Sequence, residues 1–366
     1  MNIKVLKIGS KSGLYLPNKS QFKKGEIIQI TAKKNNKKYV FLTKFNKIIS
    51  IRKQVEKELN LKIKDIINIE IKKINNLKRT KSIFHKDKID LLSLIPEKTS
   101  KGYKIIVTPF LKNNENWIRI WYSHFRGSGR QLVIKRFVDI KKFGSLLGQY
   151  QAEGTKNLNK KYPRCRLEFK NKLVNEHNDF IRYLMAIGIQ KKEFKFSTVF
   201  NLKNKNKAEV LINELNEIHK IKVQYYVSKH TRGIGISSMV RNTLLFEIIY
   251  ASMNCIRKKI TNKIITCNER LLAYSFLSKL LTGDGSLEYR RRYINNIDCR
   301  IKIADGNQEY LDDYKKILSN LGFKSYIYGI EVRAYCNKEK LNLLRSIGAF
   351  QNSKNWEKLN QVIKMI

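Results

Sequence analysis

The stretch LLGQYQAEG, residues 146–154, decides the fold, because LSKLLTGDG, residues 277–285, repeats its pattern. Each stretch is an apolar helix that ends in a small residue, an acid and a glycine, and the two acids are Glu153 and Asp284. The glycine that follows is interpreted as a helix stop that tolerates a left-handed backbone. A carboxylate is unfavourable at this end of a helix, where the dipole places partial negative charge. Two such placements indicate that the acids serve a cation.

The two stretches open two passes through a similar series of helices and strands. RLEFKNKLVNEHNDFIRYLMAIGI, residues 166–189, aligns with RIKIADGNQEYLDDYKKILSNLGF, residues 300–323. The first pass carries extra material over residues 193–220, which we interpret as an inserted strand and helix. Strands linked mostly as hairpins favour an α+β fold with antiparallel sheets over a doubly wound parallel sheet.

The N-terminal part of the chain alternates apolar and polar positions in short runs, which predicts a small β-rich region over residues 1–75. IGSKSGLYLP and KGEIIQI, with ISIRKQVEKELNLKIKDIINIEI further on, resemble the swapped-hairpin DNA-binding domains of the AbrB type. An ordinary β subdomain is the alternative. We expect a linker and β-rich segment over 76–140, a first repeat over 141–260 and a second over 261–366.

The charge of the chain points to a polyanionic partner. Among 366 residues, 75 Lys and Arg face 30 Asp and Glu, which gives a net charge of +45. Nucleic acid is such a partner, since each neutralised phosphate releases counterions. A generally Lys-rich surface is the alternative, but it explains the lysines and not the clustered arginines, such as those in YRRRY, residues 289–293.

Other features of the sequence exclude several classes of protein. No apolar run reaches the roughly 20 residues of a membrane span, and MNIKVLKIGS lacks the apolar core of a signal peptide. The five cysteines include no C-x-x-C pair, which argues against a disulfide framework or a structural zinc site. We therefore expect a soluble, cytoplasmic protein without a membrane partner.

Residues 141–366 resemble the LAGLIDADG homing endonucleases of the single-chain, two-motif type. The resemblance implies an α+β fold of two pseudo-symmetric αββαββα repeats with antiparallel saddle sheets, preceded here by the β-rich N-terminal region. It also implies that Glu153 and Asp284 fall on the metal-binding, catalytic acids. Paired carboxylates suit Mg²⁺, or another divalent cation such as Mn²⁺, which activates water and stabilises the leaving oxygen of a phosphodiester.

Small residues in the motifs predict close packing of the two helices. Gly148 and Ala152 lie one turn apart in the first copy. In the second copy Gly283 matches Ala152, but Lys279 stands where Gly148 stands. Ser278 and Thr282 are expected to supply the thin face there instead.

Basic residues after the last helix of each repeat are a further expectation from the resemblance. Family members carry a basic residue there that points back to the cleavage centre and stabilises phosphate charge. IYASMNCIRKKIT offers Lys258 or Lys259, and IGAFQNSKNWEKL offers Lys354. In a chain this rich in lysine, solvated side chains are the alternative.

The strands of both repeats alternate apolar residues with Arg, Lys, Gln and Tyr, groups suited to base edges and phosphates. The resemblance implies that these faces form a saddle on the DNA major groove. The predicted DNA-binding residues are Arg164, Arg166, Lys170, Gln224, Tyr226, Arg290, Arg291, Arg292, Arg300, Lys302, Lys324, Tyr326, Tyr328 and Arg333.

Three functions remain open at the level of sequence. A monomeric, metal-dependent homing endonuclease acting on a double-stranded DNA site is the main interpretation. An RNA maturase that assists intron splicing is the alternative, with intron RNA as its partner. A DNA-binding regulator without catalysis is the third, and the pair of intact acids argues against it.

Overall fold

The computed structural model describes the chain except residues 10, 17–20, 52, 75, 113–114, 123–130, 156–165, 230–232, 265, 294–295 and 352, and the side chains of 11, 54, 111–112, 292–293 and 296. Two compact units make up the chain. The first comprises Met1–Lys78, Glu97–Asn114 and Ile118–Val133, and the second comprises Arg79–Pro96, Glu115–Trp117 and Ile134–Ile366. Within the described residues, no helix is long and apolar enough to cross a membrane.

The N-terminal region is β-rich, as the alternating sequence predicts. A six-stranded sheet has the order β4-β3-β6-β1-β2-β5, and its neighbouring strands pair antiparallel. One face of β1 and β6 is buried at every second residue, which places Val5 and Ile67 in the core. The elements are β1 (Asn2–Ile8), β2 (Lys11–Tyr15), β3 (Ile27–Lys34), β4 (Lys37–Lys44), β5 (Ile48–Ser50), α1 (Lys53–Leu59) and β6 (Ile66–Lys73).

The segment between this sheet and the first motif helix is built from short strands and contributes to both units. Its two three-stranded sheets have the orders β11-β10-β9 and β12-β8-β7. The strands are β7 (Phe84–His85), β8 (Lys88–Asp90), β9 (Ile105–Lys112), β10 (Glu115–Tyr122), β11 (Leu132–Lys135) and β12 (Phe137–Asp139).

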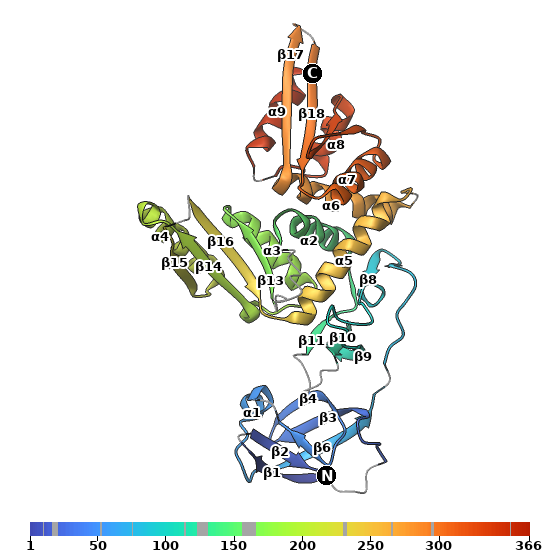
Figure 1. Cartoon of the computed structure of the whole chain (residues 1–366), viewed down its shortest axis with the longest axis vertical. Helices are drawn as coiled ribbons and strands as arrows, with labels where there is room; N and C mark the ends of the chain where they lie inside the picture. The colour runs from blue at the N-terminus through green and yellow to red at the C-terminus, as the bar shows by residue number, and fades with distance from the viewer. Residues whose placement is uncertain are drawn as a thin grey trace. The chain divides into compact units, whose positions relative to one another are not determined.

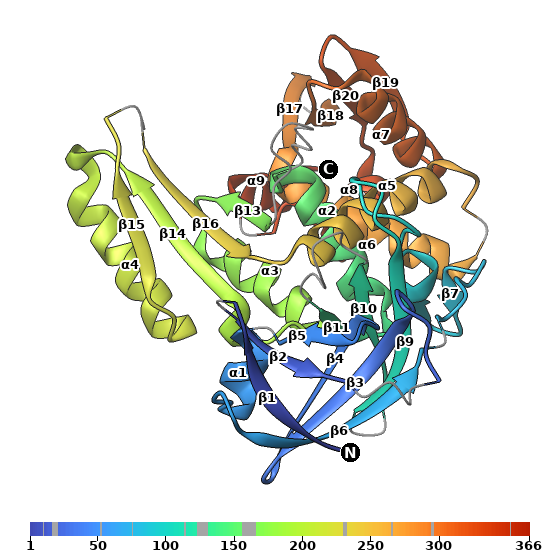
Figure 2. The same cartoon turned by 60° about the horizontal axis from the view of Figure 1, so that its bottom comes forward.

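The first repeat packs helices on a four-stranded sheet of order β13-β16-β14-β15 (Figure 2). Its apolar residues face the helices, and Leu167, Phe169 and Phe196 are almost fully buried. The elements are α2 (Ile140–Glu153), β13 (Leu167–Asn171), α3 (Val174–Ala186), β14 (Phe194–Phe200), α4 (Lys205–His219), β15 (Val223–Val227), β16 (Ile234–Val240) and α5 (Thr243–Thr261).

The second repeat has the order β17-β18-β20-β19 and is antiparallel throughout, and Figure 1 shows its strands β17 and β18 side by side. Ile301, Ile303 and Val332 form the buried face of its sheet. The elements are α6 (Cys267–Asp284), β17 (Gly285–Tyr293), β18 (Asn296–Ala304), α7 (Gln308–Asn320), β19 (Lys324–Tyr328), β20 (Glu331–Tyr335), α8 (Lys338–Ser346) and α9 (Lys354–Met365). The predicted α+β class is confirmed.

The insertion in the first repeat differs from the sequence interpretation. β14 pairs with β16 over seven residues, as β19 pairs with β20 in the second repeat, so β14 belongs to the repeat itself. The added strand is β15, which pairs only with β14 in the resolved sheet order and runs parallel to it. Because the helix α4 lies between β14 and β15 in sequence, the connection is a crossover, and a crossover produces a parallel pair. The prediction of purely antiparallel sheets was therefore wrong at this pair.

The motif helices α2 and α6 pack against each other through small residues. A Cβ atom on Gly148 would lie 2.1 Å from the carbonyl oxygen of Phe276, and one on Gly144 would lie 3.0 Å from the Cβ of Ser275. Lys279 does not obstruct this contact, because its side chain is buried against α3 instead. The close approach predicted from Gly148 is present, although its second-copy counterpart is a lysine.

Gly148→Ala tests this packing. The new methyl group meets backbone atoms of α6 that cannot rotate away, so we expect the free energy of unfolding to fall by about 1–3 kcal/mol. Gly235→Ala is the control, because the nearest atom to its added Cβ lies 3.9 Å away. Urea denaturation of both variants gives the comparison, and equal losses would refute close packing at Gly148.

Two buried cations hold the repeats together in a reciprocal way. Lys279 of the second repeat lies 2.6 Å from Asp179 and 3.4 Å from Glu176, both on α3 of the first repeat. Arg257 of the first repeat lies 2.7 Å from Asp313 on α7 of the second, and stacks 4.0 Å from the ring of Tyr310. Burial acts to lower the pKa of Lys279, but the neighbouring Glu176 carboxylate raises it overall. Each repeat thus supplies one buried cation to acids of the other.

Candidate active site

The two motif acids are the last residues of their helices. Glu153 ends α2 and Asp284 ends α6, and both are partly buried. The following glycines are extended, with φ −75° at Gly154 and −91° at Gly285, so the expectation of a left-handed stop was wrong. Glycine is required there because a Cβ would lie 2.4 Å from the carbonyl oxygen of the residue four positions earlier, Tyr150 or Leu281. β17 begins directly after Asp284, and the residue after Glu153, Gly154, forms an isolated antiparallel bridge with Phe169.

The helix ends converge. A Cβ on Gly283 would lie 2.5 Å from the Cβ of Ala152 and 3.2 Å from the Cγ of Glu153. Asp284 directly follows Gly283, so the two acids are carried by adjacent residues at the same end of the helix pair. Both helix dipoles direct their negative ends to this point, which makes it attractive to a cation.

Each acid has polar neighbours that differ between the repeats. In the first, the amide of Asn171 donates to Glu153 Oε1 at 3.3 Å. In the second, the Tyr314 hydroxyl donates to Asp305 at 3.2 Å and accepts from the fully buried amide of Gln151 at 2.8 Å. Burial, and then the charges of Asp305 and Asp284, raise the pKa of Tyr314. Tyr314 therefore stays a neutral donor to Asp305, and its raised pKa shows that the charge of Asp284 acts on it as well.

The open face of the first sheet collects most of the residues predicted there. The register pairs Lys170 with Ser237, and Ser237 with Ser197, which in turn pairs with Gln224. Cross-strand partners point to the same side of a sheet, so Lys170, Gln224 and Tyr226 share the open face. Arg166 precedes β13 and pairs with Glu168 at 3.1 Å, and Arg164 lies outside the described residues.

The open face of the second sheet collects more of them. Arg300 and Lys302 alternate with buried positions on β18, and the register places Arg290 of β17 opposite Asp298 on the same face. The register also aligns Arg300 and Lys302 with the predicted residues of β19 and β20. Arg291 points to the opposite face, across from Ile297, and the side chain of Arg292 is not described. The shared face carries Arg290, Arg300, Lys302, Lys324, Tyr326, Tyr328 and Arg333.

Comparison with protein families matches residues 272–348 to the LAGLIDADG-like domain. Residues 272–348 are therefore similar to a LAGLIDADG-like domain. No curated protein sequence matches the chain. The match begins inside α6 and ends after α8, and it therefore includes Asp284 and the whole second sheet.

Solved structures of two homing endonucleases and one LAGLIDADG meganuclease resemble the chain at low identity. The homing endonuclease I-WcaI bound to its DNA recognition sequence is 10% identical, with a TM-score of 0.36, and the match covers 60% of this chain and 87% of that one. Mesophilic variants of I-DmoI are 16% identical, with a TM-score of 0.31 and coverage of 57% and 90%. I-AabMI bound to uncleaved DNA is 9% identical, with a TM-score of 0.32 and coverage of 61% and 90%.

The lysines expected near the two motif acids lie at helix ends. Lys354 is the exposed first residue of α9, and its neighbour Asn355 donates to the carbonyl oxygen of Gly285 at 3.2 Å. The start of α9 therefore lies beside Asp284. Lys258, in the last turn of α5, pairs with Glu309 at 3.3 Å, and Lys259 pairs with Glu269 at 2.7 Å.

Acids interleave with the basic residues on the second LAGLIDADG sheet, and sequence reasoning missed their role. Lys302 lies between Glu288, at 2.5 Å, and Glu331, at 3.7 Å. The strand alternation that revealed the basic residues also placed these acids on the same face. Sequence reasoning also missed Asn171, Asp305 and Asn355. Only the fold brings these residues near the ends of α2 and α6 that carry Glu153 and Asp284.

The donor set fits a hard divalent cation. The described residues hold no group of three or more His, Cys, Asp or Glu side chains arranged for a metal. Mg²⁺ is commonly held by one or two carboxylates, with water and substrate phosphate oxygens completing its coordination. Two converging carboxylates at an open helix end match this pattern and do not match a closed protein cage.

Proposed function

We propose that the chain is a site-specific, double-stranded DNA endonuclease that needs a divalent cation held by Glu153 and Asp284. The observation that carries the proposal is the convergence of these acids at one end of α2 and α6. The basic open faces of the two sheets belong to the same repeats, and they supply the groups that neutralise phosphates and contact base edges.

The residues divide the reaction between binding and chemistry. Glu153 and Asp284 hold the cation, and Asn171 orients the Glu153 carboxylate through its hydrogen bond. A bound divalent cation supplies an activated water and stabilises the charge on the leaving oxygen. Lys354, beside Asp284, adds positive charge near the phosphate. One chain supplies both halves of the site, so the proposal includes a monomer on each DNA site.

Two parts of the proposal concern the rest of the molecule. The N-terminal sheet is proposed as an additional phosphate-contacting surface, in keeping with its AbrB-like sequence. The maturase alternative uses the same open faces on intron RNA. Cleavage is the property that separates the two functions.

Incubation of the full chain with a pool of duplexes that includes the DNA flanking its own gene tests the proposal. We expect both strands of one site to be cut with Mg²⁺ or Mn²⁺, and no cut with EDTA. Cutting that persists in EDTA would refute the metal site. Absence of any cut, combined with faster splicing of an intron RNA, would establish the maturase instead.

A further inference from the structure

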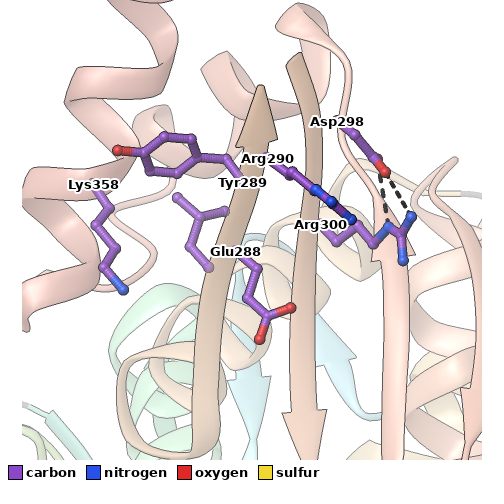
Figure 3. A pocket seen from close by; sticks show the side chains of 7 residues that line it. Glu288, Tyr289, Arg290, Asp298, Arg300 and Lys358 are labelled. Atoms are coloured by element: carbon purple, nitrogen blue, oxygen red, sulfur yellow. Dashed lines mark hydrogen bonds and ion pairs between the residues drawn. The ribbon is translucent and has the colours of Figure 1, made fainter. Parts of the chain in front are cut away.

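Two arginines in the second sheet are held by acids in the same way. Asp298 lies two residues before Arg300 on β18, and its carboxylate accepts from Nη2 at 2.6 Å and from Nε at 3.4 Å (Figure 3). Glu331 lies two residues before Arg333 on β20, and its Oε2 lies 2.9 Å from both Nε and Nη2. In both cases the acid engages the Nε–Nη2 edge of the guanidinium.

An aromatic ring supports each arginine as well. The Cζ atom of Arg300 lies 4.7 Å from the ring centre of Tyr335, its direct partner across the strands. The Cζ atom of Arg333 lies 4.1 Å from the ring centre of Tyr328 on β19. A guanidinium held at one edge by a carboxylate and over one face by a ring keeps a fixed plane, so it loses less freedom when it binds a ligand.

The guanidinium edge that does not contact the acid indicates which kind of ligand each arginine can bind. A guanidinium has a second two-donor edge, formed by Nη1 and Nη2, and both side chains remain about a quarter exposed, at 26% and 21%. Arg333 also has the side chain of Tyr326 as a hydrogen-bond partner, which the base would share or replace. Two parallel donors match two acceptors in one plane, and in the major groove guanine presents such a pair in O6 and N7. Adenine, thymine and cytosine each present one acceptor at most there, so they cannot satisfy the edge.

The place of these arginines in the sheet favours bases over phosphates. β18 and β20 are the two inner strands of the order β17-β18-β20-β19, so their open faces lie at the middle of the sheet. Arg300 pairs with Tyr335 and Lys302 pairs with Arg333, which makes the two arginines diagonal neighbours. Diagonal neighbours lie about 7–8 Å apart, which corresponds to about two base-pair steps.

We propose that Arg300 and Arg333 each read one guanine, about two base pairs apart, in the half-site bound by the second repeat. The inference rests on the proposed DNA-binding function and adds its base specificity. Asp298 and Glu331 are positioning residues that orient the two guanidinium groups. Lys302 has no planar fork and therefore serves as a charge rather than as a base reader.

Selection of bound duplexes from a randomised pool, with EDTA present so that nothing is cut, tests the proposal. The wild-type chain should enrich guanine at two positions about two base pairs apart. Arg300→Lys should relax one position and Arg333→Lys the other, each by about 5- to 150-fold in base preference. Affinity for non-specific DNA should stay constant, because lysine keeps the charge. Arg291→Lys, on the opposite face of β17, is the matched control and should leave the selected sequence unchanged.

Asp298→Asn tests whether Asp298 orients Arg300 for base recognition or only stabilises the sheet. It should relax the same position as Arg300→Lys while binding to random DNA holds or strengthens, since a negative charge is removed from the face. A selected sequence that is the same in wild type and both arginine variants would overturn this inference alone. Failure of the wild type to bind or select any duplex would overturn the proposed function, and this inference with it.

Discussion

Glu153→Gln and Asp284→Asn should each reduce DNA cleavage by about 10³-fold or more while leaving DNA affinity unchanged or higher. On the proposed mechanism each substitution removes a charged ligand of the cation, and the amide keeps the size of the side chain and one of its two oxygens. The two acids converge where Gly283 meets Ala152, so neither half of the site is complete without the other. Removal of a negative charge beside the DNA phosphates favours binding.

Single-turnover cleavage and equilibrium binding, measured on the same duplex, check this expectation. Asp312→Asn, at an exposed position on α7, is the control and should cut at the wild-type rate. A Glu153→Gln or Asp284→Asn enzyme that still cuts both strands at the wild-type rate would rule out these acids as the metal site. Equal losses of binding and cleavage would show that the acids support the fold instead.

Lys279→Met should cost about 3–5 kcal/mol of unfolding free energy, because it leaves Glu176 buried without its cation. Glu176 is only 3% exposed and also accepts from the Gln149 amide at 2.7 Å. Adding Glu176→Gln and Asp179→Asn to the same chain should recover much of the loss, since the buried charges are then removed together.

Denaturant unfolding of the single and triple variants measures the effect. Lys142→Met, at an exposed position on α2, is the matched control and should stay within about 0.5 kcal/mol of the wild type. A loss at Lys279 no larger than at Lys142, or a triple variant no more stable than the single one, would contradict the role of this buried pair.

The sequence predicted the parts of the site that follow from short patterns. The acid–glycine pattern predicted that Glu153 and Asp284 end their helices, as they do, while their role in the site stays a prediction. Alternation along single strands placed Arg300 and Arg333 on an open face. The periodicity of a strand determines its faces without knowledge of its neighbours. For this reason the faces assigned from alternation agree with the register. Arg291 is the exception, because it stands in a run of arginines and points to the face opposite that of Arg290.

Features that depend on distant segments could not be predicted in this way. The position of β15 at the sheet edge depends on whether β14 or β15 lies beside β16. The sequence pattern is the same for either arrangement, so it did not predict the crossover through α4. The partners of Lys279 lie about a hundred positions away on α3, so the sequence showed only a lysine where a small residue was expected. The glycines after the acids were correctly predicted to follow the helix ends. The reason given, a left-handed backbone, applies to other helix ends and not to these.

Because of the reciprocal ion pairs, neither repeat can take the place of the other. If two copies of the first repeat paired, Gly148 would occupy the place of Lys279, and the Glu176 carboxylates would lose the ammonium group that neutralises them. Two separately made halves, divided between α5 and α6, would accordingly prefer the mixed pair over either self-pair. The two halves are therefore not interchangeable, because each carries a buried cation or the buried acids that the other half requires.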